Sequence, residues 1–158
     1  MSDRAASPRA TRPPGAPAPA GARDAERGDG ADTRLAYDFA TVRVVPHVHL
    51  ADFVTVGVVV HARTAGYLRM RALTDPAALR ARVPDVDAEL LARYLRSWEA
   101  VCAGDPTAGP VALAPTSERF QWITAPRSDV LQSSPVHEGL CDDPAWALDE
   151  LFAAYVKA

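Results

Sequence analysis

The residues that could do chemistry are densest near the C-terminal end, between Arg127 and Asp143. An arginine followed by closely spaced hydroxyl groups can bind an anion, because guanidinium and hydroxyl groups donate hydrogen bonds to it. We therefore expect a ligand-binding loop here, joined by one arginine from earlier in the chain. The candidate residues are Arg43, Arg127, Ser128, Gln132, Ser134, His137, Asp142 and Asp143. The alternative is that the hydroxyls and the two aspartates cap turns and a helix.

Arg43 joins this set because it stands in an otherwise apolar and aromatic stretch. If its face of the predicted strand is buried, its charge needs a carboxylate or a bound anion. Arg43 and Arg127 could then converge on one anion. The alternative is that the stem of Arg43 lies on Tyr37 or Phe39, with its charged head in water.

Nucleophilic catalysis would require Cys141 and His137 to form a thiolate pair, with Asp142 or Asp143 as the orienting group. A cysteine just before a helix cap is equally natural as an apolar core residue. Residues adjacent in sequence do not by themselves have the geometry of a triad. We therefore predict no catalytic residues, and we favour a protein that is not an enzyme.

Metal binding would draw on His47, His49 and His61, with Asp52 as a further ligand. Zinc accepts three nitrogen or oxygen ligands in catalytic sites. Pro46 breaks the strand, however, and places the first two histidines on a solvated connecting turn. We therefore predict no metal site and no cofactor.

Alternation of apolar residues predicts three strands, at 35–45, 53–62 and 67–73. The last two form an antiparallel hairpin with a loop of about four residues. Shorter strands are expected at 120–123 and 129–131. In the second strand, four valines at alternate positions would share one face, and a glycine on the other face marks a bulge or a close backbone approach. These residues are Val54, Val56, Val58, Val60 and Gly57.

Helix signals fill the remainder of the chain. Asp75-Pro76 predicts a short helix over 76–82, and Asp85 or Asp87 caps a longer helix that ends at Gly104. Asp143-Pro144 begins an amphipathic C-terminal helix, and 105–117 is expected to be a loop. The predicted fold class is α+β, an antiparallel sheet with helices packed on one face.

The chain of 158 residues has a formal net charge of −3, which argues against a bulk-charge nucleic-acid binder. Two cysteines are too few for a disulfide scaffold. No apolar stretch approaches the roughly 20 residues of a membrane helix, so no membrane partner is expected. The net charge likewise leads us to expect no nucleic-acid partner. One lysine and no asparagine suggest the codon bias of a high-GC bacterial genome.

Residues 1–34 differ from the rest, because their apolar residues other than Met1 are all alanine. We expect a disordered, Pro/Ala/Gly-rich tail, followed by a single domain over 35–158. The alternative is an extension in front of a protein that starts near Thr33. Six arginines against five acidic residues make the tail nearly neutral, which argues against a strong electrostatic anchor. Without an export signal the expected location is the cytoplasm, with Cys102 and Cys141 reduced.

Several short motifs follow one another along the domain. They are Tyr37-Asp38-Phe39-Ala40, Arg43-Val44-Val45-Pro46, Asp52-Phe53-Val54-Thr55-Val56-Gly57-Val58, Arg119-Phe120, Pro126-Arg127-Ser128, Ser134-Pro135-Val136-His137 and Gly139-Leu140-Cys141-Asp142-Asp143-Pro144. In this order they resemble a bacterial family catalogued as domain of unknown function 3037. Members of that family more often carry Asn where Thr55 stands. The resemblance covers nearly all of 35–158 and none of the tail.

The resemblance implies no known reaction. It does imply a protein partner, since genes of the family often lie beside genes for HipA-like kinases. We therefore expect a cytoplasmic interaction module that binds a partner protein, such as a HipA-like kinase, without catalysis of its own. An edge strand of the hairpin could accept a strand from that partner. The alternative is a small enzyme or ligand-binding domain, with an anion pocket formed by the 127–143 loop and Arg43.

Overall fold

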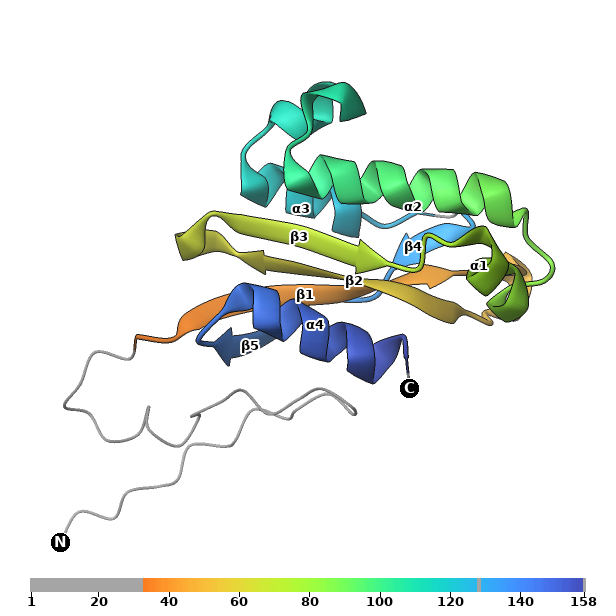
Figure 1. Ribbon diagram of the computed structural model, residues 1–158, viewed down its shortest axis with the longest axis horizontal. Coiled ribbons are helices and arrows are strands. Elements are labelled where there is room, and N and C mark those ends of the chain that lie inside the picture. The colour runs from red at the N-terminus through yellow and green to blue at the C-terminus, as the bar shows by residue number, and fades with distance from the viewer. Residues whose placement is uncertain (1–32, 128, 158) are drawn as a thin grey trace, which may run out of the picture.

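Three long strands form the centre of the molecule (Figure 1). They are β1 (Leu35–Val44), β2 (Val54–Ala62) and β3 (Tyr67–Ala72), and they pair antiparallel in the order β3-β2-β1. The computed structural model describes residues 33–127 and 129–157, so the tail predicted at 1–34 lies almost entirely outside the described residues. The predicted hairpin is confirmed, with a 3₁₀ turn at Arg63–Ala65 between β2 and β3.

Two short strands share the other edge of β1. β4 (Leu131–Ser133) pairs with the C-terminal end of β1, and β5 (His137–Cys141) pairs with its N-terminal end. β4 overlaps the short strand expected at 129–131 only at Leu131 and continues to Ser133. β5 was not predicted, because the polar residues around it suggested a loop.

The register between β1 and β2 skips one residue. Val42 pairs with Gly57, whereas the next residue, Arg43, pairs with Thr55. Val56 is therefore the additional residue of a β-bulge, which confirms the bulge predicted at this glycine. The close approach predicted at Gly57 is also present, because a Cβ there would lie 3.0 Å from a backbone carbonyl oxygen of β3.

The bulge divides the valines of β2 between the two faces of the sheet. Val54 and Val56 pack in the core beneath the long helix α2 (Ala88–Ala103), whereas Val58 and Val60 pack in the opposite core. The prediction that all four share one face is therefore wrong, because a bulge shifts the alternation of side chains by one residue.

Aspartates begin the helices as predicted. Asp75 caps α1 (Pro76–Arg82), and of the two candidates for α2 it is Asp87 whose carboxylate accepts a hydrogen bond from a first-turn N–H group. α2 ends at Gly104 in the left-handed conformation, with φ of 75°.

The C-terminal helix α4 (Pro144–Tyr155) follows its predicted cap, Asp143. The predicted loop over 105–117 contains two 3₁₀ turns, Pro106–Ala108 and Pro110–Leu113, and the first residues of a further helix.

That further helix is α3 (Thr116–Thr124), and it replaces the strand predicted at 120–123. In a strand, Phe120 and Trp122 would share one face, because residues two apart point to the same side. The buried pair is instead Phe120 and Ile123, three residues apart, as on one face of a helix. The side chain of Arg119 also donates hydrogen bonds to the carbonyls of Val101 and Cys102 at the end of α2. These contacts form only after the chain folds.

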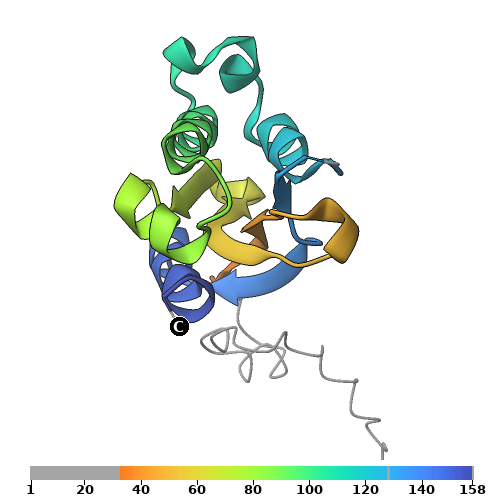
Figure 2. The ribbon, with the colours of Figure 1, turned by 90° about the vertical axis from the view of Figure 1, so that its right-hand side faces the viewer.

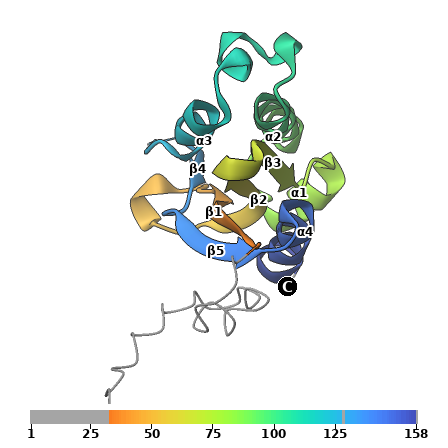
Figure 3. The same ribbon diagram turned by 90° about the vertical axis from the view of Figure 1, so that its left-hand side faces the viewer.

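The helices cover both faces of the sheet. Figures 1, 2 and 3 show α2 and α3 on one face and α4 on the opposite face. The antiparallel α+β fold class is confirmed. The sequence led us to expect helices on one face of the sheet. α1, α2 and α3 lie on one face, whereas α4 packs on the opposite face.

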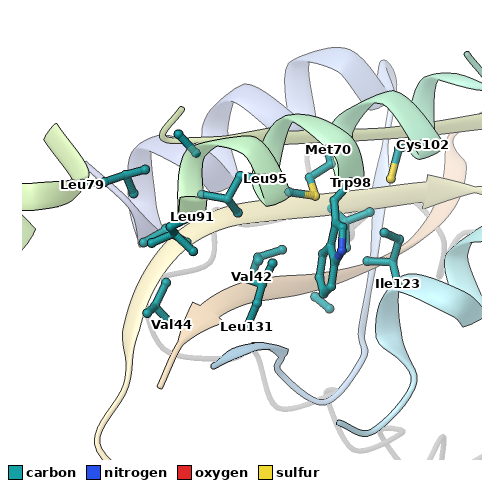
Figure 4. Packing of buried hydrophobic residues seen from close by; sticks show 14 of the residues in the cluster. Val42, Val44, Met70, Leu79, Leu91, Leu95, Trp98, Cys102, Ile123 and Leu131 are labelled. Atoms are coloured by element: carbon teal, nitrogen blue, oxygen red, sulfur yellow. The ribbon is translucent and has the colours of Figure 1, made fainter. Parts of the chain in front are cut away.

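Each face has its own hydrophobic core. The core beneath α2 is shown in Figure 4, and it includes Val42, Val44, Met70, Leu79, Leu91, Leu95, Trp98, Cys102, Ile123 and Leu131. The core beneath α4 includes Tyr37, Phe39, Val58, Val60, Cys141, Leu148, Leu151 and Phe152. β1 and β2 are therefore buried on both sides, which explains their nearly continuous apolar sequences.

Candidate binding groove

A groove of about 610 Å³ lies between the first half of α2 and the segment that leads from α3 to β4. We call it the α2–α3 groove. Its lining residues are Pro46, Asp85, Val86, Asp87, Leu90, Leu91, Tyr94, Trp98, Trp122, Arg127, Asp129, Val130 and Leu131. They come from three parts of the sequence that only the fold brings together.

Three aromatic side chains, Tyr94, Trp98 and Trp122, line the groove beside aliphatic ones. Trp98 is buried and points from α2 toward the sheet, where Figure 4 shows it between Leu131 and Ile123. Trp122 meets it from α3 in an edge-on contact, with ring centroids 6.0 Å apart. Tyr94 is 53% exposed and Trp122 38% exposed, although both are large and largely apolar. The groove therefore presents aromatic surface to its surroundings without exposing the core beneath it.

Arg127 lies against the two tryptophans and has a structural role. Its guanidinium carbon is 4.8 Å from the centroid of Trp98 and 4.9 Å from that of Trp122, the geometry of cation–π contacts. Its Nη1 and Nη2 atoms donate to carbonyls at the end of α3, those of Trp122, Ile123 and Ala125. Desolvation lowers the pKa of Arg127, against the influence of the Asp129 carboxylate. Much of its hydrogen-bonding capacity is thus directed at the helix terminus.

Three carboxylates form the rim of the groove. Asp87 caps α2, Asp85 lies 3.5 Å from the Nε2 atom of His47, and Asp129 follows Arg127 in the chain. One arginine against three aspartates leaves the charged lining with a formal net charge of −2. The groove therefore combines an aromatic interior with a rim that attracts cations.

The other residues of the predicted anion site have separate positions. Ser128 lies outside the described residues. Gln132 donates from Nε2 to the carbonyl of Asp129 at 2.7 Å. The Ser134 hydroxyl is buried, accepts from the backbone N–H of Thr41 at 2.8 Å and donates to the carbonyl of Pro135 at 2.8 Å. It completes the edge of β1 between β4 and β5.

Arg43 and His137 lie apart along β1. Arg43 pairs with Gln132 in the register, whereas His137 pairs with Phe39, four residues earlier. Four residues of strand span about 13 Å, too far for one small anion to bridge. Neither residue lines the α2–α3 groove, so the arginine expected to act with Arg127 is outside it.

Arg43 packs on an aromatic ring other than the two considered for its stem. Its guanidinium carbon lies 4.0 Å above the ring of Phe53, which is half exposed, and not over Tyr37 or Phe39. Its Nε atom is buried without a hydrogen-bond partner among residues 33–127 and 129–157. Desolvation lowers the pKa of the guanidinium.

The acidic end of the predicted site caps a helix. Asp143 accepts a hydrogen bond from the backbone N–H of Ala145 at 3.0 Å, and Asp142 is exposed before it. Cys141 is buried, and desolvation followed by these two carboxylates raises the pKa of its thiol. A raised pKa opposes thiolate formation, and His137 lies four residues away on the same strand.

The histidines do not gather into one cluster. The rings of His47 and His49 are 6.1 Å apart on the turn after β1, while His61 is buried in β2 and stacks on Phe120 with centroids 4.9 Å apart. Over the described ranges, no group of three or more metal-ligating side chains converges. In the same ranges, no helix is long and apolar enough to cross a membrane.

Sequence reasoning missed that Tyr94, Trp98 and Trp122 line a groove. A signal was present in α2, where Leu90, Tyr94 and Trp98 recur every four residues beside a second apolar stripe that includes Leu91. The outer edge of this wide apolar face, at Leu90 and Tyr94, is left exposed by the sheet. Trp122 could not be placed, because its segment was assigned to a strand.

The chain was compared with protein-family models, curated proteins and solved structures. The family model described as "Protein of unknown function (DUF3037)" matches residues 39–156, which include every described residue of the groove. No match was found among the curated proteins or the solved structures.

Proposed function

This chain belongs to the DUF3037 family of proteins of unknown function, and we propose that it is an interaction module that binds a partner protein through the α2–α3 groove. The observation that carries the proposal is the exposure of Tyr94 and Trp122 beside a buried tryptophan. Aromatic residues in well-packed, partly desolvated pockets supply most of the binding energy at protein interfaces.

The chemistry of the groove favours a peptide segment over a small anion. The rim carries three carboxylates, and the guanidinium of Arg127 is already engaged with carbonyls and indole rings. A segment with apolar side chains and a basic residue would pack on the aromatic walls and place its charge near Asp85 and Asp129.

We propose a kinase-like protein as the partner. The support for this is the gene neighbourhood that the family resemblance implies. The partner's binding segment should then combine a basic residue with apolar neighbours, in keeping with the charge of the groove.

The proposal is tested by co-purification of the full chain from its own cells, comparing the wild type with Tyr94→Ala. Truncation of an aromatic hot spot costs about 2 kcal/mol or more, which corresponds to a loss of affinity of about 30-fold. We expect a stoichiometric partner with the wild type and a loss of most of it with the variant. Thermal unfolding checks that Tyr94→Ala remains folded, as its exposure predicts.

The matched control is Trp146→Ala on α4, because Trp146 is 48% exposed and does not line the groove. We expect this variant to retain the partner. Equal retention by the wild type and Tyr94→Ala would contradict a role of the groove. Loss of the partner only with Trp146→Ala would move the interface to α4.

A further inference from the structure

We infer that the α2–α3 groove binds a segment of the chain itself, the arginine- and proline-rich stretch at 4–23, and that this contact competes with the partner. The inference rests on the groove of the proposed function and names what regulates it. Three observations support it: the charge distribution of the sequence before Thr33, the charge and aromatic lining of the groove, and the length of chain available to join them.

The near neutrality of residues 1–34 conceals a separation of charge. The acidic residues of this region lie only at position 3 and from position 24 onward. The stretch 4–23 between them contains four arginines, five prolines and no acidic residue, so it carries a formal charge of +4. Its centre reads Arg12-Pro13-Pro14-Gly15-Ala16-Pro17.

The groove is complementary to such a stretch. Proline-rich segments dock in grooves lined by aromatic side chains, where the rings of proline pack on indole and phenol faces. Tyr94 and Trp122 supply exposed aromatic faces, and Asp85 and Asp129 are exposed carboxylates of the same lining. An arginine of the segment can thus approach a carboxylate while its prolines cover the rings.

The chain is long enough for this contact. The described structure starts at Thr33, next to the N-terminal end of β1, and the groove adjoins the C-terminal end of that strand through Pro46 and Leu131. β1 spans about 33 Å. From Pro19 to Thr33 there are 14 residues, which extend to at most about 50 Å. A linker of that length can therefore bridge β1 within one chain, and it does so partly extended, because its root-mean-square span is about 20 Å.

The inference is tested by paramagnetic relaxation in the ¹⁵N-labelled full chain with a spin label at Ala16→Cys. Both native cysteines are buried, at 0% and 2% exposure, so the label attaches to the introduced thiol. We expect several-fold stronger broadening of the backbone signal of Tyr94 and the indole signal of Trp122 than of the indole signal of Trp146.

Removal of the rim charge by the double variant Asp85→Asn and Asp129→Asn should reduce the broadening several-fold. Glu150→Gln on α4 is the control variant, and it should leave the broadening unchanged. Salt at about 1 M, where the Debye length is about 3 Å, should weaken the contact as well.

Equal broadening at all three reporters, or no response to the double variant, would overturn the inference. A second sample mixes spin-labelled protein of natural isotope abundance with ¹⁵N-labelled protein that has no spin label. Broadening in this mixture would show that a second copy supplies the segment, and would overturn the contact within one chain. Groove broadening without a co-purified partner would defeat the proposed function alone. A partner lost with Tyr94→Ala, without groove broadening, would defeat the tail contact alone.

Discussion

Ser134 shows how the fold uses a hydroxyl for which the sequence leaves two roles open, ligand binding and backbone capping. Its Oγ accepts from one backbone N–H and donates to a carbonyl, in a buried gap between two strands that share an edge. Asp143 and Arg127 likewise satisfy helix termini. These residue types bind anions and cap backbones by the same hydrogen bonds, so the sequence does not distinguish the two roles.

His61 is the residue whose chemistry should be visible in the stability of the protein. It is buried in β2, and neither ring nitrogen has a hydrogen-bond partner within the described part of the chain. Desolvation is the largest influence and lowers its pKa from 6.5; Arg63 and Arg119 also lower it, against Asp38. The unfolded chain therefore takes up a proton at this residue more readily than the folded protein does. The stabilising effect is complete above the unfolded pKa and is lost as the pH falls below it.

We predict that the free energy of unfolding of the wild type falls between about pH 8 and about pH 5 by more than that of His61→Phe. Urea unfolding at both pH values measures this difference. The control is His49→Gln, an exposed histidine on the turn after β1, which should keep the pH dependence of the wild type. An unchanged pH dependence in His61→Phe would show that another group accounts for it.

At the scale of elements, α2 was predicted well because several local signals agree. Its cap, its closing glycine and its apolar period all lie within one segment. α3 and β5 were not predicted, because contacts outside their own segments stabilise them. β5 owes its conformation to pairing with β1, and α3 to packing of Phe120 and Ile123 and to the bonds of Arg119.

Arg119 provides the test at this scale. It donates to the carbonyl of Ala114 at 2.8 Å and to those of Val101 and Cys102 at 3.1 and 2.7 Å, so it ties α3 to the end of α2. Arg119→Ala should lower the free energy of unfolding by about 2–3 kcal/mol, since it leaves partly buried carbonyls without a charged donor. Arg93→Ala, an exposed arginine of α2, should lower it by less than about 0.5 kcal/mol. Equal losses in the two variants, measured by urea unfolding, would contradict this role.

At the scale of the whole molecule, the groove exists only because the fold joins three distant segments. The turn at Pro46, the first half of α2 and the stretch from Trp122 to Leu131 each look ordinary alone. Arg127, which the sequence singles out, lines the groove, whereas Arg43 and His137 lie outside it. The carboxylates and aromatic rings around Arg127 become visible only when α2 and α3 lie side by side.

The central claim is that a partner protein occupies this groove, and photo-crosslinking in living cells tests it most directly. A photoreactive phenylalanine analogue replaces Tyr94 in the full chain, and the matched control carries it in place of Trp146, which is similarly exposed outside the groove. We predict a discrete crosslinked species from position 94 whose mass exceeds that of the chain by that of one other protein, and none from position 146. A discrete heavier species from position 146, with position 94 giving none, would contradict the account.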